Sequence, residues 1–108
     1  MTQRDAVGLG GVQVTVSGDL AAGAAAEARR RVAALSRYTR SPIIHARVRL
    51  TRVPAAERPV IAQANVSVNG RLLRARVAAR TVREAIDRLE PRLRRQLLRV
   101  AGRRRSNR

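Results

Sequence analysis

The dipeptide Asn69-Gly70 constrains the fold of this chain more than any other feature of the sequence. Asparagine and glycine readily adopt the positive φ angles of a two-residue β-hairpin turn, and both flanking segments alternate apolar and polar side chains. The sequence therefore predicts a hairpin of residues 60–68 and 71–78. Its expected inward side chains are Ala62, Ala64, Val66, Val68, Leu73, Ala75 and Val77, and its expected outward ones are Gln63, Asn65, Ser67, Arg74 and Arg76.

Two further strands are predicted by the same two-residue period. The first covers residues 12–16 and places three valines on one face. The second covers residues 43–51, and residues 54–59 then form a loop with a proline at each end. In the second strand we expect one face of Ile44, Ala46, Val48 and Leu50 and an opposite face of His45, Arg47, Arg49 and Thr51.

An amphipathic helix is predicted between these strands, over residues 20–38. Ser17 or Asp19 can cap its first turn, because a short side-chain oxygen accepts a free backbone N–H there. The segment before Pro42 should end it, since a residue that precedes proline avoids helical geometry. Its apolar stripe consists of Ala21, Ala24, Ala28, Val32, Leu35 and Thr39, with Arg30 and Arg37 on the opposite side.

A second helix is predicted to start after Thr81, with Glu84 completing a capping box. Pro91 lies inside the helix and should kink it at a cost of about 3 kcal/mol, because proline lacks the backbone donor. We expect Gly102 to end the helix. Its apolar stripe consists of Val82, Ile86, Leu89, Leu93, Leu97 and Val100.

The resulting order is β-α-β-β-β-α, an α+β fold. Each helix has one apolar stripe and the sheet has one apolar face, so we expect a four-stranded sheet with both helices on one face, like a double-stranded-RNA-binding domain. The expected division is a disordered tail of residues 1–11, one RNA-binding domain of residues 12–102 and a basic tail of residues 103–108.

The charge of the chain points to a polyanionic partner. Among its 108 residues, 24 are basic, all of them arginine, and the net charge is +17. Such self-repulsion disfavours a compact state unless a polyanion relieves it, and guanidinium groups bind phosphate through paired hydrogen bonds. No apolar run approaches the roughly 18 residues of a membrane span, so we expect a cytoplasmic protein that binds nucleic acid.

Catalysis and cofactors are not expected. The chain has no cysteine, a single histidine and seven scattered acidic residues. No spacing typical of metal ligands or of a phosphate-binding loop is present. Tyr38 is the only aromatic residue, so a platform that stacks bases on aromatic rings is excluded, and Tyr38 itself is expected in the core.

Arginines recur on one side of the last helix. Arg88, Arg92, Arg95 and Arg99 fall within a sector about 60° wide, apart from the acidic residues of that helix. We name these four residues the arginine ridge and interpret them as an RNA-binding surface, although a solvated helix face is the alternative. The same alternatives hold for the outward strand residues Arg47, Arg49, Arg74 and Arg76, whose mutual repulsion a polyanion would relieve.

Three segments resemble the ribosome hibernation-promoting factors, also called ribosome-associated inhibitors. They are Val66-Ser-Val-Asn-Gly70, Ala85-Ile-Asp-Arg-Leu89 and Arg92-Leu-Arg-Arg-Gln-Leu97. The chain departs from that family at Thr81 and Arg83, where many members have Asp and Tyr, and at Pro91. Long members add a C-terminal module, so the chain is either a short form or the N-terminal part of a longer protein.

The resemblance implies a bacterial stress factor that occupies the decoding channel of the small ribosomal subunit and inhibits translation. It assigns rRNA contacts to the arginine ridge and, more weakly, to Arg30, Arg31 and Arg37. A double-stranded-RNA-binding module and a stress-related protein-interaction domain are the alternatives. No membrane partner, small-molecule substrate, metal or other cofactor is expected.

Overall fold

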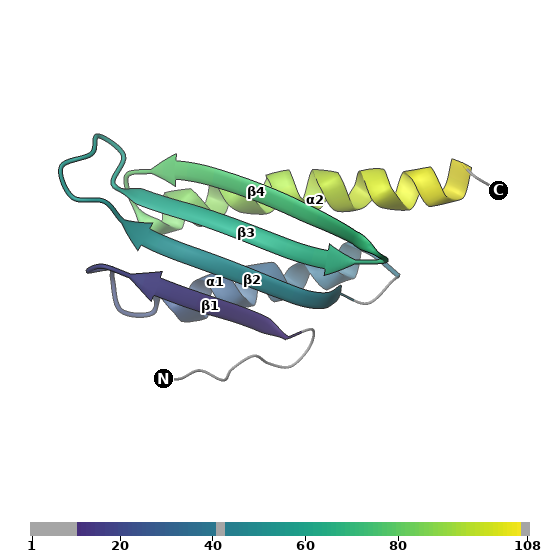
Figure 1. The fold of residues 1–108 in the computed structure, drawn as a ribbon, viewed down its shortest axis with the longest axis horizontal. Helices are drawn as coiled ribbons and strands as arrows, with labels where there is room; N and C mark the ends of the chain where they lie inside the picture. The colour runs from purple at the N-terminus through teal and green to yellow at the C-terminus, as the bar shows by residue number, and fades with distance from the viewer. Residues whose placement is uncertain (1–10, 41–42, 107–108) are drawn as a thin grey trace.

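The chain has the predicted element order in a computed structural model, which describes residues 11–40 and 43–106, the last six as backbone only (Figure 1). The expected β-α-β-β-β-α arrangement is confirmed, with a short 3-10 helix η1 after the first helix. The elements are β1 (Val12–Ser17), α1 (Ala24–Ala33), η1 (Ala34–Tyr38), β2 (Ile43–Arg52), β3 (Val60–Val68), β4 (Arg71–Ala79) and α2 (Val82–Ser106).

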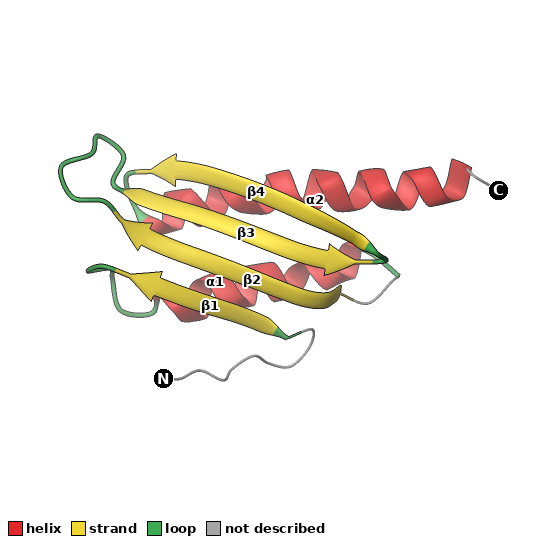
Figure 2. Cartoon of the chain, in the orientation of Figure 1, coloured by secondary structure: helices red, strands yellow, loops and turns green. Residues whose placement is uncertain are grey.

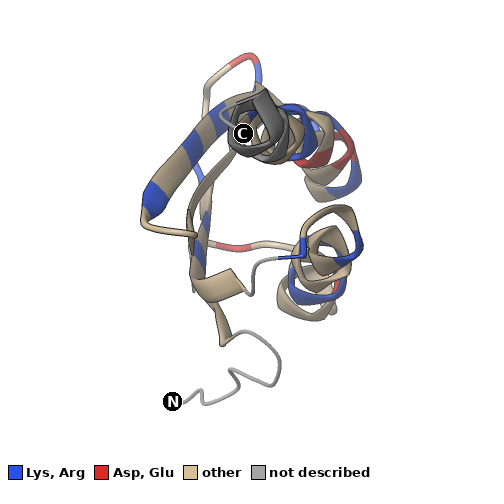
Figure 3. Cartoon of the chain, turned by 90° about the vertical axis from the view of Figure 1, so that its right-hand side faces the viewer, with Lys and Arg blue, Asp and Glu red and all other residues tan. Residues whose placement is uncertain are grey.

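The four strands lie in sequence order in one sheet. β1 and β2 are parallel and joined by α1, whereas β2, β3 and β4 are antiparallel neighbours. Both helices cover the same face of this sheet, as predicted (Figures 2 and 3). The opposite face is therefore left open, and β1 and β4 are the edge strands.

The hairpin of β3 and β4 is confirmed, including its turn. Asn69 and Gly70 have φ angles of 54° and 73°, which is the pattern of a type I′ turn. Every inward side chain predicted for these two strands is buried. The turn thus fixes the register, and the register places Arg74 and Arg76 on the outward positions of β4.

A β-bulge in β2 overturns the predicted place of Ile44. The pairing with β3 shifts between Ile43 and His45, so Ile43 turns inward, with 8% of its surface exposed, and Ile44 turns outward, with 66% exposed. A bulge inserts one unpaired residue, which the two-residue alternation cannot anticipate. From His45 onward the alternation holds, with Ala46, Val48 and Leu50 buried.

The first helix starts later than predicted, at Ala24. Gly23 precedes it in a left-handed conformation, with φ 85°, and no side chain caps the first turn, so the predicted cap by Ser17 or Asp19 is wrong. The stripe is confirmed at Ala24, Ala28, Val32 and Leu35, which are buried, and is wrong at Ala21, which is exposed, and at Thr39, which is extended and only half-buried. After α1 the chain continues as η1, which ends at Tyr38. The predicted end of the helix before Pro42 lies outside the described residues.

The last helix starts as predicted. The hydroxyl of Thr81 accepts a hydrogen bond from the Glu84 N–H at 3.1 Å, while the Glu84 carboxylate accepts one from the Arg80 N–H rather than from Thr81. The helix then continues through Pro91 as one element. It also passes Gly102 and ends at Ser106, so the predicted end at Gly102 is wrong. A glycine weakens a helix but does not end one that can continue beyond it.

The core between the sheet and the helices consists of small and branched side chains. Twenty-three hydrophobic residues are buried, and no polar or charged residue is buried among those described. The largest fully buried side chains are Leu35, Leu50, Ile86, Leu89, Leu93 and Leu97. Every described arginine is therefore left on the surface or at its margin.

Candidate nucleic-acid interface

The arginine ridge lies on the solvent side of α2, but one of its four members, Arg88, already contacts neighbouring groups of the chain. Arg88 forms an ion pair with Glu84 at 2.9 Å and donates a hydrogen bond to the Ala78 carbonyl at 3.4 Å. The expected separation of the ridge from acidic residues is thus wrong at this end, since a residue four positions earlier shares a helix face. Arg92, Arg95 and Arg99 are exposed and form no ion pair with the described residues.

The sheet arginines lie on the open face in two cross-strand rows. One row runs Gln13, Arg47, Asn65 and Arg74, and the other runs Thr15, Arg49, Gln63 and Arg76. A neutral residue of β3 separates the two cations of each row, whose strands lie about 10 Å apart. The two cations of a row do not face each other directly, so the expected repulsion between facing cations is wrong. Each row instead has an amide side chain between its two arginines.

β4 brings the two arginine sets together. Arg74 and Arg76 line a hollow of about 470 Å³ with Arg92, Arg95 and Arg99 of α2, together with Ala75 and Gln96. We name this hollow the seam groove, because it follows the line where α2 lies beside the β4 edge. Among the described residues no carboxylate lines it, so five arginines border the hollow without a neighbouring counter-ion.

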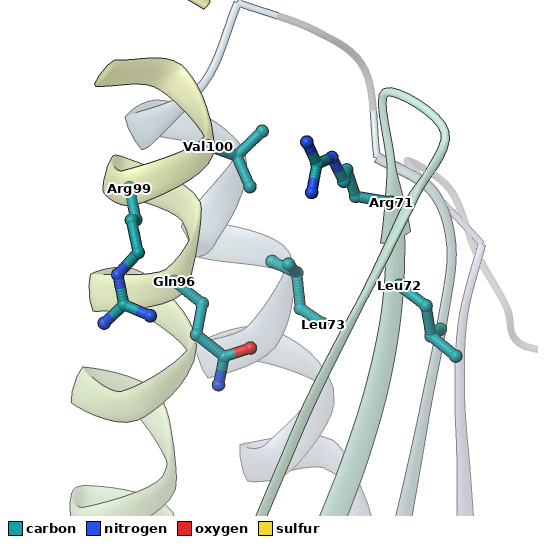
Figure 4. Close-up of a pocket in the computed structure, with 6 residues that line it drawn as sticks. All are labelled: Arg71, Leu72, Leu73, Gln96, Arg99 and Val100. Atoms are coloured by element: carbon teal, nitrogen blue, oxygen red, sulfur yellow. The ribbon is translucent and has the colours of Figure 1, made fainter. Parts of the chain in front are cut away.

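Gln96 joins the two walls of this groove. Its side-chain amide donates a hydrogen bond to the Arg74 carbonyl at 2.7 Å and accepts one from the Arg74 N–H at 3.3 Å. Figure 4 shows the neighbouring pocket, which shares Gln96 and Arg99 with the seam groove. In this view the Gln96 side chain extends from α2 toward β4, and Arg71 and Val100 lie near each other above it. This role of Gln96 is not predictable from the sequence, because nothing in the pattern of α2 indicates which strand atoms lie beside a polar side chain.

Two arginines of the first helix, Arg30 and Arg31, form ion pairs. Arg30 binds Glu27, and Arg31 binds Asp87 of α2 at 2.9 Å and Glu27 at 3.6 Å. The hydrogen bond from Arg30 holds the pKa of Glu27 below its ordinary value. The hydrogen bond to Asp87 raises the pKa of Arg31, so this guanidinium stays charged.

The single aromatic ring lies between two guanidinium groups. The Arg94 and Arg37 side chains approach the Tyr38 ring at 5.6 Å and 6.0 Å from its centroid. Tyr38 is half-buried against the core, as expected, and borders a second hollow of about 340 Å³ lined by Arg30, Arg31 and Arg37. Because Glu90 also lines this hollow, its charge is partly neutralised, unlike that of the seam groove.

The described part of the chain contains one histidine and no cluster of metal ligands. His45 is half-buried on the outward side of β2, opposite Ser67 of β3. No three His, Cys, Asp or Glu side chains among the described residues lie close enough to hold a metal ion. None of the described helices is long and apolar enough to span a membrane.

Two solved structures have a fold similar to that of this chain. The N-terminal domain of Protein Y from Thermus thermophilus superposes with a TM-score of 0.67 at 25% identity, over 81% of this chain and 94% of that domain. A ribosomal subunit interface protein from Coxiella burnetii superposes with a TM-score of 0.62 at 17% identity, over 82% of this chain and 97% of that one. A search of curated protein sequences gave no match.

The family comparison covers nearly the whole described chain. The family model of the Sigma 54 modulation protein / S30EA ribosomal protein matches residues 11–105, which span every strand and nearly all of the last helix. This match agrees with the resemblance to hibernation-promoting factors in β3 and α2. The chain therefore belongs to the Sigma 54 modulation protein / S30EA ribosomal protein family.

Proposed function

We propose that the protein is a ribosome-binding inhibitor of translation. It acts in the bacterial cytoplasm under stress or in stationary phase and occupies the decoding channel of the small subunit through contacts of arginine with rRNA phosphates. The observation that carries this proposal is that five arginines, none of which forms an ion pair with a described residue, line the seam groove on a fold of the S30EA family. No enzymatic activity is part of the proposal.

The contribution of each arginine follows from its existing contacts. Arg92, Arg95 and Arg99 with Arg74 and Arg76 can bind phosphate without first breaking an ion pair. Arg47 and Arg49 extend the surface across the open face, at sites about 10 Å from the β4 cations. We assign smaller contributions to the arginines that already contact a carboxylate or an aromatic ring, which are Arg30, Arg31, Arg37 and Arg88.

Co-sedimentation with purified small ribosomal subunits tests the proposal. Each neutralised phosphate releases counter-ions, so the logarithm of affinity should fall with the logarithm of salt by about 0.7 to 0.9 per contact. The triple variant Arg92→Gln/Arg95→Gln/Arg99→Gln should lose most of its binding. The charge-matched control Arg52→Gln/Arg58→Gln/Arg83→Gln, with all three positions exposed, should keep it.

Inhibition is measured separately in a cell-free translation reaction. The unmodified protein should lower the yield when it is present in excess over ribosomes, and the triple variant should not. Equal binding of control and triple variant, or an affinity that does not change with salt, would refute the proposed contacts. Binding to isolated duplex RNA as tight as binding to subunits would instead favour a double-stranded-RNA-binding module.

A further inference from the structure

The β4 edge is fastened to α2 at two points. Gln96 binds both backbone polar groups of Arg74, and Arg88 binds the carbonyl of Ala78. The fastening residues of α2 are eight apart, about 12 Å along a helix, and their partners on β4 are four apart, about 13 Å along a strand. Because the two lengths agree, helix and strand run side by side in a fixed register.

The backbone of Arg76 lies between these two points. In an antiparallel ladder, alternate residues direct both N–H and C=O to the same side. The backbone N–H and C=O of Arg74 point away from β3 toward Gln96. Those of Arg76, two residues further along β4, therefore point to the same free edge of the sheet. No described side chain bonds to the Arg76 N–H, which leaves a backbone donor at the β4 edge in a residue that lines the groove.

The groove has the composition of a phosphate site. Five arginines from two walls line it, it has a volume of about 470 Å³, and none of the described carboxylates lines it. Guanidinium groups and a backbone N–H are the donors that bind phosphate oxygens in proteins. A carboxylate ligand would find the same charges, but the chain's excess of +17 is matched better by a polymer that presents repeated phosphates.

We propose that the seam groove binds a phosphodiester of the RNA backbone, and that Gln96 is the positioning residue that holds its two walls together. This inference rests on the proposed function for the identity of the RNA. Gln96 contacts the chain rather than the ligand: its amide sets the distance of Arg74 and Arg76 from Arg92, Arg95 and Arg99. The groove is thus one defined site within the wider basic surface.

The test compares three variants of the full chain. Arg76→Gln/Arg95→Gln removes one cation from each wall, and Gln96→Met keeps the side-chain length and all five cations but removes both hydrogen bonds to Arg74. Arg52→Gln/Arg58→Gln removes the same charge at exposed positions outside the groove. Affinity is measured over a range of salt concentrations, once with small ribosomal subunits and once with a short oligouridine strand.

For Arg76→Gln/Arg95→Gln, we expect the salt slope to fall by about 1.4 to 1.8 and affinity to fall about tenfold or more. Gln96→Met should weaken binding several-fold and lower the slope, while its unfolding midpoint stays near that of the unmodified protein. Hydrogen exchange at the Arg74 N–H should accelerate in the same variant. The control Arg52→Gln/Arg58→Gln should keep the slope.

The outcomes separate the two proposals. If the unmodified protein binds subunits and the groove variants behave like the control, the groove is overturned and the ribosomal function stands. If the unmodified protein does not bind subunits but the groove variants lose oligouridine affinity and slope, the function is overturned and the groove stands. A Gln96→Met variant with unchanged slope and affinity would remove the positioning role.

Discussion

Arg31 of α1 donates a hydrogen bond to Asp87 of α2 at 2.9 Å, and this contact joins the two helices that cover the sheet. The Arg31 side chain is 28% exposed and that of Asp87 is 55% exposed, so solvent screens the pair only in part. Glu27 lies on the other side of the same guanidinium at 3.6 Å. The helices are therefore linked by charge outside the apolar core.

Replacing Asp87 by asparagine should lower the free energy of unfolding by about 0.5 to 1 kcal/mol, which is the usual range for a partly exposed ion pair. Urea unfolding measures the change. Combined with Arg31→Gln, the two effects should be less than additive, because each variant alone removes the same contact. Asp19→Asn, at an exposed carboxylate without an ion pair among the described residues, is the control. Strict additivity would show that the helices are not coupled here.

The bulge in β2 predicts opposite sensitivities at two adjacent isoleucines. Ile43→Ala removes a buried side chain and should cost about 2 to 3 kcal/mol of stability. Ile44→Ala removes an exposed one and should change stability by about 0.5 kcal/mol or less. Chemical denaturation of the two variants is the measurement. The reverse order would place the register shift elsewhere in the strand.

The charge environment of Glu27 gives a pH prediction. Hydrogen bonding from Arg30 holds the pKa of Glu27 below 4.5, with a smaller contribution from Arg31. The stabilisation is therefore complete above pH 4.5 and is lost as the pH falls through the lowered pKa. A carboxyl NMR titration should show that Arg30→Gln moves the Glu27 pKa up toward 4.5. Arg58→Gln, in the loop between β2 and β3, should leave the titration unchanged.

Within the arginine ridge, the contacts of each arginine predict unequal effects on RNA affinity. Arg88→Gln should weaken binding to small ribosomal subunits less than Arg92→Gln does, because Arg88 already neutralises Glu84 and binds Ala78. Filter binding or sedimentation at fixed salt measures the ratio. Since both variants lose one charge, a difference cannot come from net charge. A larger loss for Arg88→Gln would mean that its internal contacts break in the complex.

Local patterns predicted most of the fold, because local patterns cause most of it. The Asn69-Gly70 turn and the alternation around it set the hairpin, and the spacing of leucines in α2 set its buried stripe. The structure differs from the prediction at positions where a second local effect outweighed the pattern in the sequence. At Ile44 a bulge shifted the register, and at Gly102 the helix tolerated a weak residue rather than ending.

The candidate site was predictable in its residues but not in its geometry. The period of α2 identified Arg92, Arg95 and Arg99, and the period of β4 identified Arg74 and Arg76. Their meeting in one groove depends on the packing of an edge strand beside a helix, which no local spacing encodes. The same holds for Gln96, whose role depends on backbone atoms 22 residues away.

The amide of Gln96 also has a consequence for association between copies of the protein. A bare strand edge offers its backbone groups to the strands of other molecules and so promotes aggregation. In β4, the outward groups of Arg74 are already occupied from within the molecule, and flanking cations repel a second copy. At Arg74 the β4 edge is therefore a poor template for pairing with a strand of a second copy.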